Sequence, residues 1–139
     1  MPDRILLHIV WTTRDREPLI SQPVARFLSR FLRAVARQER AEVLAMGMVR
    51  THVHVLARVH PTTSIPRLLQ RWKGGSAVIA AREGVVRPRG LAWAKSYSVT
   101  PVGPRQLPAV RDYVANQAQR HPDAAIGRTC VRVGRKNAG

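Results

Sequence analysis

The stretch Arg50–Val59, RTHVHVLARV, constrains the fold of this chain more than any other segment. Side chains of a β-strand point alternately to the two faces of its sheet. One face of this strand is apolar enough to pack on helices: Thr51, Val53, Val55, Ala57 and Val59. The other face is polar and is expected to be open to solvent: His52, His54, Leu56 and Arg58, with His60 just beyond. The stretch therefore predicts an antiparallel sheet with a core face and a functional face.

Periodicity and turn residues predict the other elements of the chain. Strands are expected at Ile5–Thr12, Glu42–Val49 and Thr51–Val59, with another inside Leu91–Val102. Helices are expected at Ser21–Arg40, Ser64–Ala81 and Leu107–Arg120. Lys73–Gly75 is a weak helix interior, which we expect to bend the second helix or end it early. The order β-α-β-β-α-β-α predicts an α+β fold of ferredoxin-like or RRM-like type, with helices on one face and the histidines on a central strand.

The length of 139 residues fits one domain with a hydrophobic core. We expect that domain at residues 1–122, followed by a basic, flexible tail at residues 123–139. No segment reaches the roughly 18 to 20 apolar residues of a membrane span. Cys130 is the only cysteine, which excludes an internal disulfide and a multi-cysteine zinc site and suits a reducing cytoplasm.

The charge balance indicates a polyanionic partner. The chain has 24 lysines and arginines against 8 aspartates and glutamates, a formal net charge of +16. Nucleic acid is the default partner of such a chain, so a cytoplasmic, nucleoid-associated protein is expected. The alternative is arginine inflation from GC-rich coding, but that bias exchanges lysine for arginine without removing acidic residues.

The histidine pair indicates chemistry beyond simple binding. His52 and His54 share one face of the strand, and neutral imidazoles are common ligands of divalent metals. Two ligands do not complete such a site, so further ligands must come from elsewhere in the chain. The alternative is an ordinary polar sheet surface.

The third predicted helix, VRDYVANQAQRHP, carries a second candidate pair. Tyr113 and Gln117 are four residues apart and project from the same helix face. A phenol can attack phosphorus covalently, although its pKa of about 10 means that it needs a nearby cation or base. The amide oxygen of Gln117 is a candidate third ligand for a hard cation. The alternative is a helix whose tyrosine packs on the sheet with Val110 and Val114.

Taken together, these segments resemble the small single-tyrosine HUH transposases, the insertion-sequence transposases of the two-hundred/six-hundred-five group. His52-Val53-His54 matches the histidine–hydrophobic–histidine motif of that family, and Tyr113 and Gln117 match the Y-x-x-x-Q spacing of its tyrosine helix. Three further segments resemble family motifs: HIVWTTRDREPLI, LLQRWKGGSAVIA and AWAKSYSVTPVG. The resemblance covers roughly Ile5–Pro122 in the family's order.

The resemblance implies a DNA transposase that cleaves and rejoins single-stranded DNA at hairpin-marked element ends. Tyr113 would form a 5′-phosphotyrosine link and leave a free 3′-hydroxyl. His52, His54 and Gln117 would hold Mg²⁺ or Mn²⁺. A homodimer and a single-stranded DNA substrate with hairpins are the implied partners, and no nucleotide cofactor is needed because the phosphotyrosine conserves the bond.

Phosphate contacts are expected from five basic residues, each of which has the alternative of a solvated charge: Arg50, Arg58, Arg67, Arg71 and Lys73. Three other functions stay open. A domesticated relative would nick repeated extragenic palindromes with the same chemistry. A non-enzymatic RRM-like module would bind nucleic acid, although the central strand lacks the usual aromatic residues. A plasmid relaxase or rolling-circle initiator usually needs a longer chain.

Overall fold

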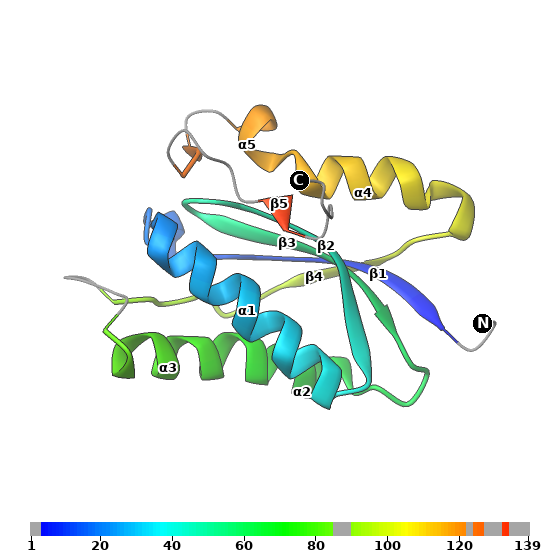
Figure 1. Cartoon of the computed structure of the whole chain (residues 1–139), viewed down its shortest axis with the longest axis horizontal. Coiled ribbons are helices and arrows are strands. Elements are labelled where there is room, and N and C mark those ends of the chain that lie inside the picture. The colour runs from blue at the N-terminus through cyan, green and yellow to red at the C-terminus, as the bar shows by residue number, and fades with distance from the viewer. Residues whose placement is uncertain (1–3, 85–89, 122–123, 127–131, 134–139) are drawn as a thin grey trace.

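A computed structural model of the chain describes residues 4–84, 90–121, 124–126 and 132–133. It contains a five-stranded antiparallel sheet in the order β4-β1-β3-β2-β5 (Figure 1). The strands are β1 (Ile5–Thr12), β2 (Ala41–Val49), β3 (His52–Val59), β4 (Ser98–Pro101) and β5 (Arg132–Val133). The helices are α1 (Gln22–Gln38), α2 (Ile65–Gln70), α3 (Ser76–Arg82), α4 (Leu107–Ala115) and α5 (Gln117–Arg120). The predicted α+β class and antiparallel sheet are confirmed.

The histidine strand β3 occupies the middle of the sheet, as predicted. β1 flanks it on one side, with Val10 opposite His54 and Thr12 opposite His52. β2 flanks it on the other side, with Gly47 opposite His54. Because directly opposed residues of antiparallel strands share a face, these neighbours surround the histidines on one surface of the sheet.

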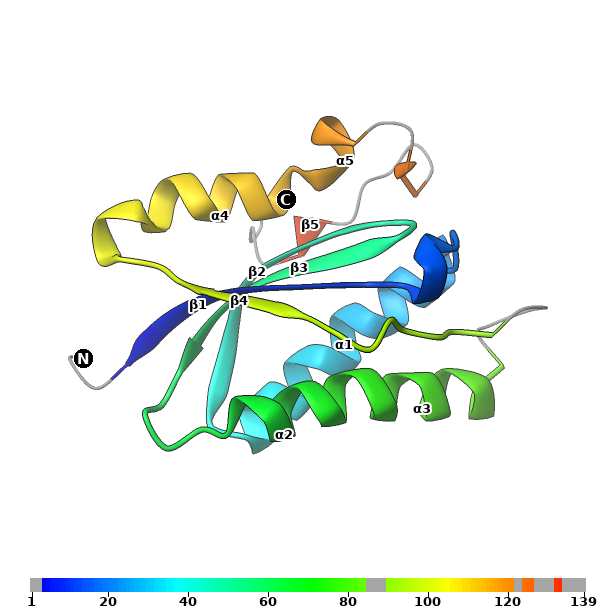
Figure 2. The same ribbon diagram turned by 180° about the vertical axis from the view of Figure 1, so that it is seen from behind.

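Helices α1, α2 and α3 cover the apolar face of the sheet, as expected (Figures 1 and 2). α1 begins where the Ser21 hydroxyl accepts a hydrogen bond from the Val24 backbone N–H at 3.4 Å, with Pro23 in the first turn. This N-cap and the arginine-spaced apolar residues of α1 are the features that predict the helix. Its buried residues include Phe27, Leu28 and Leu32.

The weak point in the second helix neither ends it nor breaks it. A π-helical segment, Arg71–Gly75, joins α2 to α3, and the helix continues to Arg82. The π-turn directs the indole of Trp72 into the core, where Nε1 donates to the Leu32 carbonyl at 3.0 Å. A Cβ atom at Gly75 would lie 2.9 Å from the Phe31 ring, so the glycine allows α1 to pack closely.

The prediction that all helices lie on one face is wrong for α4 and α5, which cover the opposite face, beside the histidines (Figure 2). A second apolar cluster holds them there, made by Leu44, Ala45, Leu56, Val102 and Val114. The single leucine of the polar face, Leu56, is fully buried in this cluster. Leu56 was therefore the one sign in the sequence that this polar face packs against another element.

Gly47 lets α4 approach the sheet closely. A Cβ atom built at this position would lie 1.7 Å from the carbonyl oxygen of Val114 and 3.1 Å from Cγ of Gln117. Only a residue without a side chain fits between β2 and the backbone of α4. The helix predicted at Leu107–Arg120 is also interrupted, because Asn116 leaves helical geometry (φ −109°, ψ 33°) between α4 and α5.

Most of the predicted basic tail, including Cys130, lies outside the described residues. Within it, β5 pairs with β2 at Met46 and Gly47, which extends the sheet by a short edge strand. In the part of the chain that the structure describes, no helix is long and apolar enough to cross a membrane.

Gly47→Ala is expected to destabilise the protein by about 1–3 kcal/mol, the usual cost of overpacking. The added methyl group collides with the α4 backbone, so the helix must move away from β2. Urea or thermal unfolding measures the loss. Gly74→Ala is the matched control, since nothing lies within 4 Å of its Cβ position and alanine favours a helix over glycine. Equal stability of the two variants would contradict the close approach of α4.

Candidate active site

His52 and His54 lie beneath α4 and α5 and are 7% and 6% exposed. The expectation that their face is open to solvent is therefore wrong, and the second apolar cluster under α4 is the reason. Their rings stand 5.1 Å apart in an edge-to-face arrangement. The pair is a buried, preorganised group rather than part of a solvated sheet surface.

Tyr113 and Gln117 meet the histidine pair, as the sequence predicts. The Tyr113 ring lies 5.7 Å from the His54 ring. Gln117 is fully buried, and its Nε2 donates to the Tyr113 carbonyl at 2.8 Å. Its Oε1 is also buried and has no hydrogen-bond partner among the described residues. One chain thus brings the phenol, two imidazoles and a free amide oxygen together.

Three residues that sequence reasoning missed complete the group. His8 of β1 places its ring 5.1 Å from that of His54, and His121 places its ring 5.1 Å from that of His52. Arg120 holds its guanidinium 4.4 Å from the centre of the Tyr113 ring. Signals for the two histidines were available, since strand alternation puts His8 on the polar face and His121 follows Gln117 by four residues. To assign these two histidines to the site, one must also know that β1 pairs with β3 and where α5 lies.

Each histidine of the pair has a hydrogen-bond partner on Nδ1. The Nδ1 of His52 lies 3.0 Å from the Thr51 hydroxyl. The Nδ1 of His54 lies 2.9 Å from Nε2 of His8. A hydroxyl oxygen and an imidazole nitrogen can both accept, so both Nδ1 atoms can carry the proton. In that tautomer both Nε2 atoms keep a lone pair for a ligand.

Burial keeps the imidazoles neutral. It lowers the pKa of His54 to about 3, and nearby His52, His8 and His121 act in the same direction. Burial also lowers the pKa of His52 to about 4, with His121 adding to the shift and the Gln117 amide opposing it. The pKa of His8 is lowered by burial too. At neutral pH these rings are uncharged, the form in which imidazole binds metals.

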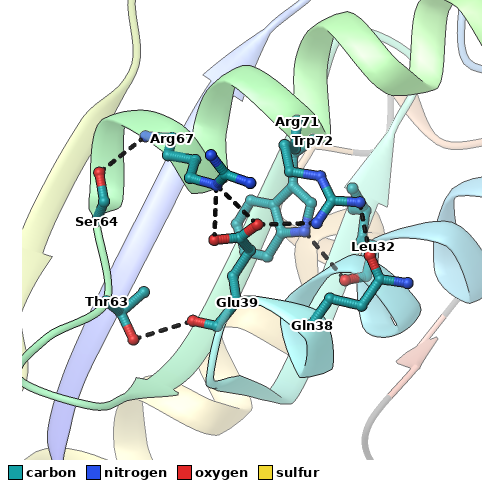
Figure 3. A network of polar contacts seen from close by, with 8 residues as sticks. All are labelled: Leu32, Gln38, Glu39, Thr63, Ser64, Arg67, Arg71 and Trp72. Carbon is teal, nitrogen blue, oxygen red and sulfur yellow. Dashed lines mark hydrogen bonds and ion pairs between the residues drawn. The ribbon is translucent and has the colours of Figure 1, made fainter.

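The five predicted phosphate-binding residues do not form one surface. Arg67 and Arg71 lie on either side of Glu39 (Figure 3). Their nitrogen–oxygen distances to the carboxylate are 3.0 and 2.8 Å. Hydrogen bonds from these arginines lower the pKa of the Glu39 carboxyl. Lys73 donates to the backbone carbonyls of Lys95 and Ser96 at 3.1 and 3.3 Å. These three cations join α2 and the π-helical segment to the end of α1 and to the loop before β4.

The other two predicted cations lie elsewhere. Arg50 is exposed in the turn between β2 and β3, close to the histidine end of β3. Arg58 lies near the opposite end of β3, 3.3 Å from the carboxylate of Glu42. DNA contact by any of the five stays a prediction.

Comparison with known proteins identifies the family. Residues 3–117 match the sequence model of the family described as "Transposase IS200 like". The chain belongs to this transposase family. The matched range contains the histidine pair of β3 together with Tyr113 and Gln117, and it confirms the resemblance seen in the sequence. Membership implies a DNA transposase activity.

Individual relatives agree with this assignment. The ISDra2 transposase TnpA of Deinococcus radiodurans is 29% identical over 117 residues, which cover 79% of this chain and 81% of that protein. A crystal structure of a transposase from the same species has a TM-score of 0.64 at 27% identity, covering 82% of this chain and 91% of that one. A REP-associated tyrosine transposase bound to a REP hairpin has a TM-score of 0.66 at 13% identity, covering 84% and 68%. The last likeness supports the fold alone.

Acidification is expected to destabilise the metal-free protein through the buried rings. An unfolded histidine has a pKa near 6.5, whereas folded His52 and His54 take up protons only near pH 4 and pH 3. Between these values the unfolded chain binds more protons, so stability is full above pH 6.5 and falls as the pH drops. The loss at pH 4 is about 3 kcal/mol for each ring.

Urea unfolding at pH 7 and pH 4 measures this loss. His54→Asn removes one ring and should reduce the difference between the two pH values by about 3 kcal/mol. His60→Asn is the control, because that ring lies outside the site and hydrogen-bonds to Thr62. An undiminished pH dependence in His54→Asn would contradict the neutral burial of His54.

Proposed function

We propose that this chain cleaves and rejoins single-stranded DNA at hairpin-marked ends of an insertion element, through a 5′-phosphotyrosine on Tyr113. The observation that carries the proposal is the meeting of the Tyr113 phenol with the His54 imidazole, at 5.7 Å between ring centres, inside a transposase fold. Tyr97, the other tyrosine of the chain, is exposed and lies near Lys73, away from the histidines. Tyr113 is therefore the candidate nucleophile.

The residues present fit a divalent metal ion. The described residues contain no cluster of three His, Cys, Asp or Glu that would hold a metal by themselves, so a third ligand must be of another type. Gln117 supplies one, because Nε2 donates to the Tyr113 carbonyl and the buried Oε1 accepts no hydrogen bond from the described residues while His52 is neutral. A buried oxygen without a partner is unfavourable, and a cation relieves that cost. His52, His54 and Gln117 are the proposed ligands of Mg²⁺ or Mn²⁺.

A bound metal would polarise the scissile phosphate and stabilise negative charge on its oxygens. The Tyr113 oxygen forms a bond to phosphorus as the bond to the 3′-oxygen breaks, which gives the 5′-phosphotyrosine and a 3′-hydroxyl. Arg120, with its guanidinium over the Tyr113 ring, would stabilise negative charge on the phosphate under attack. Attack by an incoming 3′-hydroxyl reverses the step and joins strands without a nucleotide cofactor.

Two features support hairpin DNA as the substrate. The formal charge of +16 favours a polyanion, and the REP-associated tyrosine transposase of similar fold is bound to a hairpin. The homodimer expected of the family is part of this proposal, and the four central groups already meet within one chain.

A second candidate, the nicking of repeated extragenic palindromes, shares the chemistry and is favoured by that same neighbour. Hairpin ends that flank the gene would favour the transposon.

Incubation with single-stranded hairpin DNA and Mn²⁺ should give a covalent protein–DNA adduct on denaturing electrophoresis. Tyr113→Phe removes the attacking oxygen and should abolish the adduct, while Tyr97→Phe should retain it. His52→Ala should also abolish it through loss of a metal ligand. An adduct that survives Tyr113→Phe but disappears in Tyr97→Phe would assign the nucleophile to the wrong tyrosine.

His8→Leu is expected to weaken Mn²⁺ binding about 10- to 100-fold, the usual cost of losing a partner that orients a metal-binding histidine. His8 accepts from Nδ1 of His54 in the tautomer that frees Nε2, and leucine cannot accept. Titration of Mn²⁺ followed by electron paramagnetic resonance measures the affinity without DNA. His8→Gln restores an acceptor and should recover part of it. Equal affinities for wild type and His8→Leu would contradict the role of His8 in orienting His54.

A further inference from the structure

A pocket of about 530 Å³ lies at the end of β3 far from the histidine pair. We call it the arginine pocket, and its lining residues are Arg4, Arg37, Arg40, Ala41, Glu42 and Arg58. The four arginines come from separate parts of the chain: the segment before β1, the last turn of α1, the turn after α1, and β3. Only the folded chain brings them together, so sequence spacing could not indicate the group.

The charge in this pocket is unbalanced. Glu42 is the single acidic residue of the lining, and it pairs with Arg58 at 3.3 Å. Four guanidinium groups around one carboxylate repel each other unless an anion joins them. Nε of Arg58 is also buried and has no acceptor among the described residues. This atom is closed off from solvent, so a phosphate in the pocket would contact the terminal nitrogens of the arginines and not Nε of Arg58.

Arg40 is a poor choice for the backbone position that it occupies. It follows the C-cap of α1 with φ of 62°, in the left-handed region where glycine is favoured. Termination of the helix alone would be served better by glycine. Nη1 of its guanidinium donates to the Thr62 hydroxyl at 3.2 Å, and the group also lines the pocket, so an arginine at this position serves both contacts.

We propose that the arginine pocket binds backbone phosphates of the DNA substrate at a distance from the scissile bond. Guanidinium groups contact phosphate oxygens in a bidentate manner, which suits the four donors of the pocket. Arg58 lies four residues from His54, about 13 Å along β3. Leu56, covered by α4, separates them on the same face, so the two sites contact different parts of the DNA. This inference rests on the proposed function and extends it to substrate binding.

The test measures DNA affinity against salt concentration. The probe is a fluorescent DNA hairpin with a single-stranded extension, whose sequence is arbitrary because phosphate contacts are independent of sequence. The full chain carries Tyr113→Phe, so that binding is measured without cleavage. Arg37→Gln with Arg58→Gln should lower the slope of log affinity against log salt by about two, one for each lost phosphate contact.

Arg26→Gln with Arg30→Gln is the matched control. These arginines are exposed on α1 outside the pocket, and their loss changes the net charge by the same amount. The control should keep the wild-type slope. Equal slopes for the pocket variant and the control would overturn the proposal, because bulk charge would then explain all the binding.

Glu42→Gln provides a test that misfolding cannot imitate. Removal of the one carboxylate frees Arg58 and raises the positive charge of the pocket. Affinity for the hairpin should therefore increase several-fold at moderate salt, with a steeper salt dependence. Unchanged or weaker binding would overturn the proposal.

Failure of this inference can be separated from failure of the proposed function. Adduct formation by the chain with Tyr113 intact tests the transposase chemistry, whereas the salt slope tests the pocket. An adduct together with unchanged slopes in the pocket variants would reject the arginine pocket alone. Absence of the adduct in wild type would reject the proposed chemistry, whatever the slopes.

Discussion

The contact between Gly47 of β2 and the α4 backbone at Val114 is the constraint on which the candidate site depends. It brings a helix against a sheet face that the chain otherwise lines with polar side chains. The same contact covers Leu56, buries the histidine pair and sets Tyr113 beside His54. The packing of α4, the neutral state of the imidazoles and the position of Tyr113, the candidate nucleophile, thus all depend on the absence of a side chain at Gly47.

Polar networks on the two faces of the sheet do different work. Around Glu39, two arginines, a glutamine and a threonine join α1 to the start of α2 and leave little of their charge for a ligand (Figure 3). Around the histidines the partners are neutral: Thr51 and His8. Because these partners are neutral, the Nε2 lone pairs of His52 and His54 stay available for a ligand, which an ion pair at the same nitrogens would prevent. The chemistry of the partners therefore distinguishes the Glu39 network from the candidate site.

Local pattern predicted the elements well. Alternation identified β3, helical spacing identified α1, and the resemblance to the transposase family implied that Tyr113 and Gln117 lie beside the histidines. Properties that depend on contacts between residues far apart in the sequence could not be predicted from local pattern. Whether Arg67 is free or paired depends on Glu39, 28 residues away. The burial of His54 depends on Gly47 and α4. The position of His8 beside His54 depends on the pairing of β1 with β3. The arginine pocket has the same origin, because its members meet only after folding.

The short strand β5 has a consequence for solubility. It pairs with β2 at Met46 and Gly47, the stretch of that strand against which α4 packs. β2 is a long, apolar strand, and an uncovered strand edge is a template for pairing with other chains. Arg132 and Val133 thus cover the edge of β2 at Met46 and Gly47, where an open backbone would favour aggregation. A truncation made to remove a basic tail would also remove this cover.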